Sequence, residues 1–235
     1  MPLQLFGTAF AIIKATQPCA INIVKYKPVY MFQEEESIIE PSGCYYLTLN
    51  IVDRVDIFIK PVFKQVIVES LNYFIEKKGL IIYGWCLMSN HLHLAVRTKD
   101  GFDLAQVIKD FKIFTAKIIL EDIDAESEVR RNWMMKKFKE AFVFDHFQVW
   151  QTSDQPVRID LKKRNNLHEC LQHIHNNPVR NKIVSAPQDY LHSSSRNYLG
   201  FHGLVKVQLP GLRDETDHIF HNAPSYTYAY QKTYE

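Results

Sequence analysis

The most constraining feature of this chain is a pair of strand-like segments joined by only two residues. Residues 79–88 (GLIIYGWCLM) and 91–98 (HLHLAVRT) are short, apolar and rich in β-branched or aromatic side chains, as expected of buried strands. Ser89 and Asn90, which separate them, both have turn chemistry. We therefore expect a tight hairpin, which places the two segments side by side in an antiparallel sheet.

The segments around the hairpin complete a split βαβ pattern. Apolar residues recur at helical spacing in three stretches, and Pro178 should end the last of them by pushing the residue before it out of helical geometry. The predicted strands are 43–52, 79–88, 91–98 and 146–152, and the predicted helices are 61–77, 103–120 and 164–177. This order predicts an α+β fold, a ferredoxin-like or RRM-like antiparallel sheet with helices on one face.

Length and composition favour one globular domain. The 235 residues are 46% hydrophobic and 23% charged, enough to bury a core. We expect an N-terminal extension at 1–40, a main domain at 41–200 and a C-terminal tail at 201–235. The sequence contains no apolar run of about 20 residues, so we expect no membrane partner. The four cysteines are scattered, which favours reduced thiols and a cytoplasmic location.

The net charge of +2 is too small to identify a polyanionic partner, but the basic residues are clustered. Residues 130–139 contain five basic and no acidic side chains, with aromatic residues among them. Such a cluster suits a phosphate backbone, although a solvated helix face would explain it as well. The candidate DNA contacts are Lys109, Lys112, Arg130, Arg131, Lys136 and Lys137.

His91 and His93 form a candidate metal site. Side chains of a strand alternate between its faces, so these two imidazoles project from the same face while Leu92 and Leu94 point toward the helices. Two imidazoles on one face can reach a single metal ion. A lone HxH pair is also compatible with two ordinary half-buried histidines.

The surrounding motifs resemble a known family. The stretch WCLMSNHLHLAV, followed by LQHIHNNPVRNKIV and then PQDYLHSSSRNYLG, is similar to the single-tyrosine HUH transposases of the insertion-sequence 200-like group, and most closely to their REP-associated tyrosine transposase branch. In the name HUH, two histidines flank a hydrophobic residue, here His91, Leu92 and His93. The resemblance covers roughly residues 43–200.

This resemblance implies a site and a substrate. In the family, the two histidines and an Asn or Gln of a later helix hold a divalent ion such as Mg²⁺ or Mn²⁺, which polarises a phosphate of single-stranded DNA. The matching ligands here are His91, His93 and Asn177. The family tyrosine attacks that phosphate and conserves the phosphodiester energy in a covalent adduct. The implied partner is single-stranded or hairpin DNA, and the implied protein is a monomer or homodimer.

The position of the family's nucleophile holds His173 instead of tyrosine, because HIHNNPV aligns without a gap with the family's Tyr-to-Asn spacing. Three interpretations remain open. Cleavage has been lost while DNA binding persists; another group such as Tyr190, Tyr198 or a metal-bound water attacks; or His173 itself attacks or ligates the metal, with Glu169 one turn further back. In a homodimer, a tyrosine of the partner could also serve.

Other histidine chemistries fit less well. Histidine-triad nucleotide hydrolases need a third alternating histidine, and Ala95 fills that position. Two-histidine phosphoesterases need a second H-x-[ST] motif on another strand, and no suitably spaced copy occurs. The alternative from a different class is a catalytically inactive module that recognises hairpin or single-stranded DNA on the same sheet face without cutting it.

Overall fold

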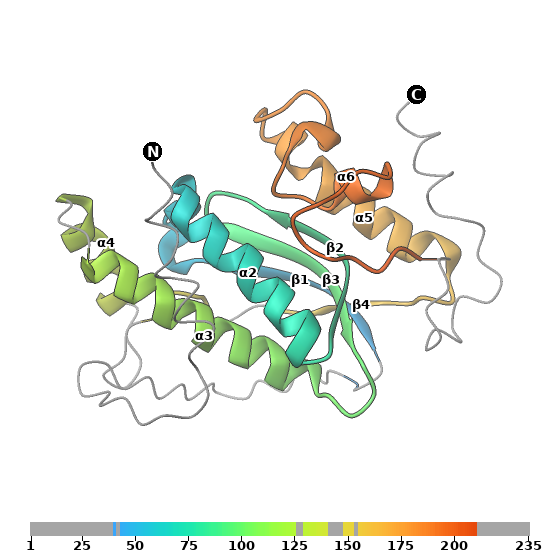
Figure 1. Cartoon of the computed structure of the whole chain (residues 1–235), viewed down its shortest axis with the longest axis horizontal. Helices are drawn as coiled ribbons and strands as arrows, with labels where there is room; N and C mark the ends of the chain where they lie inside the picture. The colour runs from blue at the N-terminus through green and yellow to red at the C-terminus, as the bar shows by residue number, and fades with distance from the viewer. Residues whose placement is uncertain (1–39, 41–42, 126–128, 141–147, 153–154, 211–235) are drawn as a thin grey trace.

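The computed structural model describes residue 40 and residues 43–125, 129–140, 148–152 and 155–210, and these form the fold in Figure 1. The predicted extension, apart from residue 40, and the tail beyond residue 210 lie outside the described residues. Residues 201–210, which we assigned to the tail, pack on the domain: Val205 is buried in the core and the Leu204 carbonyl accepts a hydrogen bond from Asn72.

The centre of the fold is a four-stranded antiparallel sheet with the order β2-β3-β1-β4. The strands are β1 (Cys44–Asn50), β2 (Leu80–Leu87), β3 (His91–Thr98) and β4 (Val157–Ile159). The β2–β3 hairpin turns through Ser89 and Asn90, as predicted. This strand order is that of a ferredoxin-like sheet, so the predicted fold class is confirmed.

Two long helices, α2 (Pro61–Lys77) and α3 (Leu104–Ala125), cover one face of the sheet (Figure 1). Leu92 and Leu94 point into this layer and are fully buried there, as alternation predicts. A third helix, α5 (Arg164–Arg180), instead packs on the opposite face through Leu171 and Ile174. The expectation of helices on one face therefore holds for α2 and α3, whereas α5 covers part of the face that we expected to be open.

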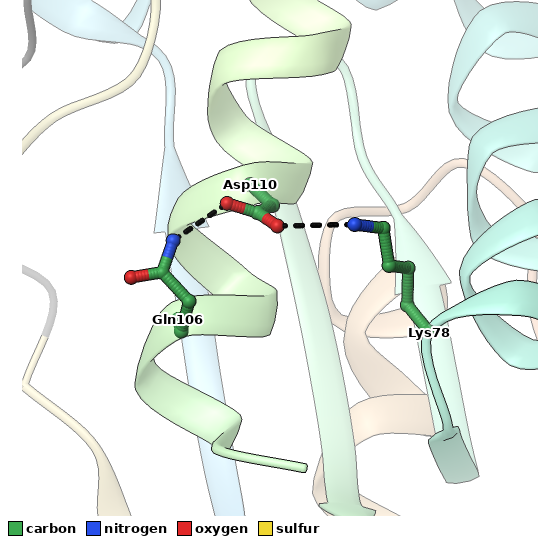
Figure 2. A network of polar contacts seen from close by, with 3 residues as sticks. All are labelled: Lys78, Gln106 and Asp110. Carbon is green, nitrogen blue, oxygen red and sulfur yellow. Dashed lines mark hydrogen bonds and ion pairs between the residues drawn. The ribbon is translucent and has the colours of Figure 1, made fainter. Parts of the chain in front are cut away.

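A small polar network joins the end of α2 to α3 (Figure 2). The Lys78 ammonium, just after the last residue of α2, lies 3.4 Å from Oδ2 of Asp110, and Gln106 donates to the other oxygen of the same carboxylate at 2.6 Å. Both charged side chains are more than a third exposed to solvent. Such a surface pair contributes little to stability, so the buried apolar layer holds these helices together.

The fourth strand is not the predicted one. Residues 141–147 lie outside the described part of the chain, and residues 148–152 form no strand but one isolated bridge, between Trp150 and Ile51. Val149 and Trp150 are buried, and the Trp150 indole donates to Thr115 Oγ1 at 2.9 Å. The apolar pattern of this segment therefore reflects packing against α3.

The predicted end of α5 at residue 177 is also wrong, because the helix continues through Pro178 to Arg180. A proline in a helix removes one hydrogen bond to the carbonyl four residues earlier. Only two helical residues follow Pro178, and the chain turns at once into a cap in which the Asn181 N–H donates to Asn177 and Val179 carbonyls. Asn177 consequently stays in the helix, on the face that points toward the sheet.

The segment after α5 closes the outer edge of β2. The Leu87 N–H donates to the His192 carbonyl, the Ser194 N–H to the Trp85 carbonyl and the Gln208 N–H to the Ile82 carbonyl, each at 2.8–2.9 Å. The HSSSRNY segment, which includes His192 and Ser194, therefore has a structural role. The remaining elements are α4 (Val129–Glu140), α6 (Ser195–Tyr198) and the 3₁₀ turns η1 (Val52–Arg54), η2 (Ile57–Ile59) and η3 (Pro187–Asp189).

Candidate functional site

His91 and His93 lie at the start of β3 on the face opposite α2 and α3. Their ring centroids are 4.7 Å apart with the rings nearly perpendicular. In the β1–β3 register, Asn50 faces His91 and Thr48 faces His93. His93 is buried and His91 is half-buried. The strand alternation predicted from the sequence thus brings both imidazoles to one place.

Helix α5 adds Asn177 to this pair. The Asn177 side-chain amide nitrogen lies 2.8 Å from Nε2 of His93. Two neighbouring ligands of an octahedral ion bound at about 2.1 Å lie about 3 Å apart, so this spacing fits a shared metal. Ligation requires Oδ1 in place of the amide nitrogen, which a rotation about the Cβ–Cγ bond supplies. The exposed Asn181 amide nitrogen donates to Asn177 Oδ1 and to the Asn177 backbone carbonyl, both at 2.9 Å, so the rotation exchanges the Oδ1 contact with Asn181 for one with the metal.

Asn90 fixes the proton position of His91. The Asn90 amide nitrogen donates to the Arg54 carbonyl at 3.1 Å and to Asp56 Oδ1 at 2.9 Å, so its Oδ1 must be the atom 2.7 Å from His91 Nδ1. An amide oxygen only accepts, which means that Nδ1 carries the proton and Nε2 keeps its lone pair. His91 is therefore held as the tautomer that binds metal through Nε2.

Both histidines are neutral at physiological pH. Burial lowers the pKa of His93 to about 3, with smaller contributions from the neighbouring His91, His173 and Arg54. Burial likewise lowers the pKa of His91 to about 4, and Arg54 adds to this effect while Asp56 opposes it. Neutral imidazole is the form that ligates metal, so protons do not compete for these nitrogens near pH 7.

His173 lies one helical turn before Asn177, beside the pair. Its ring centroid is 5.9 Å from that of His93, and its side chain is exposed. Burial and the adjacent Arg180 guanidinium lower its pKa. An Arg180 N–H lies 3.1 Å from His173 Nδ1, and because a guanidinium only donates, neutral His173 accepts at Nδ1 and carries its proton on Nε2.

Tyr190 and Tyr198, considered above as substitute nucleophiles, have structural roles instead. The Tyr190 hydroxyl donates to the Leu87 carbonyl and the Tyr198 hydroxyl to the Tyr83 carbonyl, both at 2.7 Å from inside the protein. Both side chains are buried against β2. Both hydroxyls are engaged by backbone carbonyls inside the protein, which argues against either as the nucleophile.

Several residues depart from the expectation. His175 is fully buried, although it lies in a polar stretch of the sequence, and its ring is 2.7 Å from Ser194 Oγ. Sequence reasoning also missed Tyr46 and Thr48 of β1, which both contact His93 Nδ1. Finding them needed the register of β1 against β3, which no pattern in a single strand supplies.

The candidate DNA contacts fall into two groups. Lys109 and Lys112 are on α3, on the face of the sheet opposite the histidines. Lys112 is buried, and its ammonium donates to the Gln151 carbonyl at 2.9 Å. A buried ammonium that donates to the protein's own backbone does not suit the DNA contact that we expected of Lys112. The other four are on α4, where Arg131 is half-buried and Lys136 is exposed. An Arg130 N–H lies 3.3 Å from the Asp56 carbonyl, and the Lys137 ammonium lies 3.0 Å from an oxygen of Asp53.

Within the described residues, no group of three His, Cys, Asp or Glu side chains could hold a metal ion. The site therefore differs from a closed structural metal centre, which uses four such ligands. Two imidazoles and one amide oxygen leave coordination positions for water or a phosphate oxygen. That donor set fits a hard divalent ion that also binds substrate.

Comparison with known proteins supports the family and the fold. A family model described as "Transposase IS200 like" matches residues 42–158, about half of the chain. The chain has the fold of a solved REP-associated tyrosine transposase bound to a REP hairpin, with a TM-score of 0.50 and 14% sequence identity over 86% of this chain and 99% of the other. No curated protein matches the chain.

This chain belongs to the IS200-like transposase family. It is thus a member of a family of DNA-transposition proteins, and its antiparallel sheet carries His91 and His93. Among the helices of the described residues, none combines the length and apolar character needed to cross a membrane.

Proposed function

We propose that this protein binds single-stranded or hairpin DNA and holds one of its phosphates at a divalent ion bound by His91, His93 and Asn177. The observation that carries the proposal is the convergence of Asn177 from α5 with His93 from β3, at 2.8 Å. When bound, the metal would polarise a phosphate P–O bond and neutralise its charge. Support also comes from the family, whose members generally use a divalent metal.

The DNA would reach this site along α4. Arg130 and Lys137 contact the loop at 53–56, and the same loop accepts the hydrogen bonds of Asn90, which orients His91. A basic helix therefore lies against the loop that flanks the histidine pair. Phosphates on either side of the bound one would contact Lys136 and Arg131, which supply affinity without reading sequence.

We propose further that the wild-type protein binds DNA without capturing it covalently. Position 173 carries an imidazole in place of the tyrosine hydroxyl, and its two nitrogens are both engaged, Nδ1 by Arg180 and Nε2 by its own proton. In this arrangement the lone pair of His173 on Nδ1 accepts from Arg180, so the imidazole presents no free lone pair to phosphorus or to a metal. The contact between Arg180 and His173 therefore supports the inactive, DNA-binding alternative over a histidine nucleophile.

The test uses a labelled single-stranded hairpin DNA, Mn²⁺ and three proteins: wild type, His173→Tyr and His173→Phe. Fluorescence anisotropy with and without chelator reports binding, and a denaturing gel reports covalent adduct. We expect all three to bind the hairpin more tightly with Mn²⁺ and only His173→Tyr to form an adduct. His173→Phe controls for the aromatic ring, because it lacks the hydroxyl.

Two results would contradict the proposal. A wild type that does not bind the hairpin would contradict the proposed DNA binding. Hairpin binding in the presence of Mn²⁺ that is unchanged in His91→Ala and His93→Ala would show that the metal site does not contribute to it. A covalent adduct of the wild type would show that another residue attacks, and mass spectrometry of the adduct would identify it.

A further inference from the structure

Two hydroxyl groups of β1 lie at the side of His93 that faces away from Asn177. The Tyr46 hydroxyl is 2.8 Å and Thr48 Oγ1 is 3.1 Å from His93 Nδ1, and Thr48 donates to the Tyr46 oxygen at 3.0 Å. These three contacts form a closed triangle of polar atoms. Both side chains are half-buried, and they come from the strand that pairs directly with β3.

The donor and the acceptor of each hydrogen bond around His93 can be assigned. Asn177 Oδ1 accepts from Asn181, so the Asn177 amide nitrogen, which only donates, is the atom that faces His93 Nε2 in this structure. Nε2 therefore carries the lone pair, and a neutral imidazole then has its proton on Nδ1. The Thr48 hydroxyl donates to Tyr46, which leaves the two hydroxyl oxygens as the acceptors of that Nδ1 proton. Oriented in this way, the imidazole presents Nε2 to the position where the proposed function needs a ligand.

We infer that Tyr46 and Thr48 are positioning residues that hold His93 as the Nδ1–H tautomer and aim Nε2 at the metal. This inference rests on the metal site of the proposed function. Metal-binding histidines donate their other N–H to a partner that fixes the ring, and loss of such partners lowers metal affinity about 10–100-fold. His93 has two such partners, so removal of one leaves the other to accept the proton.

The same geometry distinguishes Tyr46 from a nucleophile. Its hydroxyl lies beside Nδ1, whereas the metal and the phosphate would lie beside Nε2, on another edge of the ring. Its own ring packs edge-on against His173, with centroids 5.8 Å apart. Tyr46 therefore acts through His93 and supports the side chain at position 173, and we expect no covalent bond from Tyr46 to DNA.

The experiment compares Tyr46→Phe, Thr48→Val and the double variant with wild type. Each change removes a hydroxyl and keeps the size of the side chain. The control is Tyr45→Phe: the Tyr45 hydroxyl is also on β1, but it accepts from the Glu40 N–H at 2.7 Å and its ring faces the other side of the sheet. Titration with Mn²⁺ gives the metal affinity, and long-range ¹H–¹⁵N NMR spectra of the metal-free protein give the His93 tautomer.

We expect wild type and Tyr45→Phe to show His93 with its proton on Nδ1 and equal Mn²⁺ affinity. The single variants should bind Mn²⁺ more weakly, and the double variant about 10–100-fold more weakly, with a mixed tautomer at His93. A double variant with the wild-type tautomer would overturn the inference, as would DNA bound covalently to Tyr46. A wild type that fails to bind Mn²⁺ would refute the proposed function instead, while the metal-free NMR spectra would still decide the role of Tyr46 and Thr48.

Discussion

Asn177 and His93 are in hydrogen-bond contact, at 2.8 Å, although 84 positions separate them in the chain. The contact depends on α5 lying against β2 and β3 on the face that carries the histidines. Asn177→Ala should therefore weaken Mn²⁺ binding at least about tenfold without unfolding the protein. Asn177→Gln, which keeps the amide on a longer side chain, should retain more of the affinity. Calorimetric titration with Mn²⁺ measures both, and equal affinity of Asn177→Ala and wild type would exclude Asn177 as a ligand.

The approach of α5 to the sheet depends on Gly84. A Cβ at this position of β2 would collide with the Leu171 side chain of α5. We expect Gly84→Ala to push α5 outward, lower stability by about 1–3 kcal/mol and weaken Mn²⁺ binding, because Asn177 moves with the helix. Adding Leu171→Ala should restore part of the metal affinity by making room. Urea denaturation and Mn²⁺ titration measure the two effects, and an unchanged metal affinity in Gly84→Ala would contradict this coupling.

Asn90 should matter to metal binding although we assign it no metal contact. Asn90→Ala removes the acceptor of the His91 Nδ1 proton and the donor that holds the loop at 53–56. We expect about a tenfold or greater loss of Mn²⁺ affinity. Asn90→Asp keeps the acceptor but faces Asp56 with a second negative charge, so it should fall between Asn90→Ala and wild type. Wild-type affinity in Asn90→Ala would show that His91 needs no such partner.

Acid should destabilise the protein through its buried histidines. Burial lowers the pKa of His175 to about 3, whereas an unfolded histidine has a pKa near 6.5. The unfolded state therefore binds the extra proton first, and stability falls as the pH decreases from about 6.5 toward 3. In His175→Gln, the free energy of unfolding should change less steeply with pH between 6 and 4, by up to about 1.4 kcal/mol per pH unit. Identical slopes for the two proteins, measured by urea denaturation, would contradict a buried neutral His175.

Lys136 should contribute to DNA affinity through salt-dependent contact with phosphate. Lys136→Ala should weaken hairpin binding and reduce the slope of log K against log salt by about one. Lys117→Ala is the control, because Lys117 is an exposed lysine of α3 on the far side of the sheet. Anisotropy titrations at several salt concentrations measure the slopes. Equal slopes for the two variants would mean that DNA does not follow α4.

The elements with strong periodicity were predictable from the sequence. The helix at 61–77 and the strand at 91–98 match the structure at both ends, because many apolar positions define each pattern. The HxH pair could be placed on one face for the same reason. By contrast, β4 has three residues, and two of them are exposed, which leaves no alternation to detect.

The contacts between distant segments were not predictable in the same way. The side of the sheet that α5 covers depends on the connection after β4, and no local pattern in residues 164–180 indicates it. The partners of His93 are Tyr46 and Thr48, which face it only because β1 pairs with β3 in one register. The family resemblance supplied Asn177 as a candidate, but the proton positions of the imidazoles required the geometry.

The cover over the outer edge of β2 has a consequence for the fate of damaged gene copies. Backbone groups of His192, Ser194 and Gln208 occupy hydrogen-bonding positions that a strand at the margin of a sheet otherwise offers to other molecules. A reading frame interrupted just before His192 would still encode both histidines and Asn177. Its product would expose the apolar strand LIIYGWCL. We expect such a product to aggregate, even though it still contains all three candidate metal ligands.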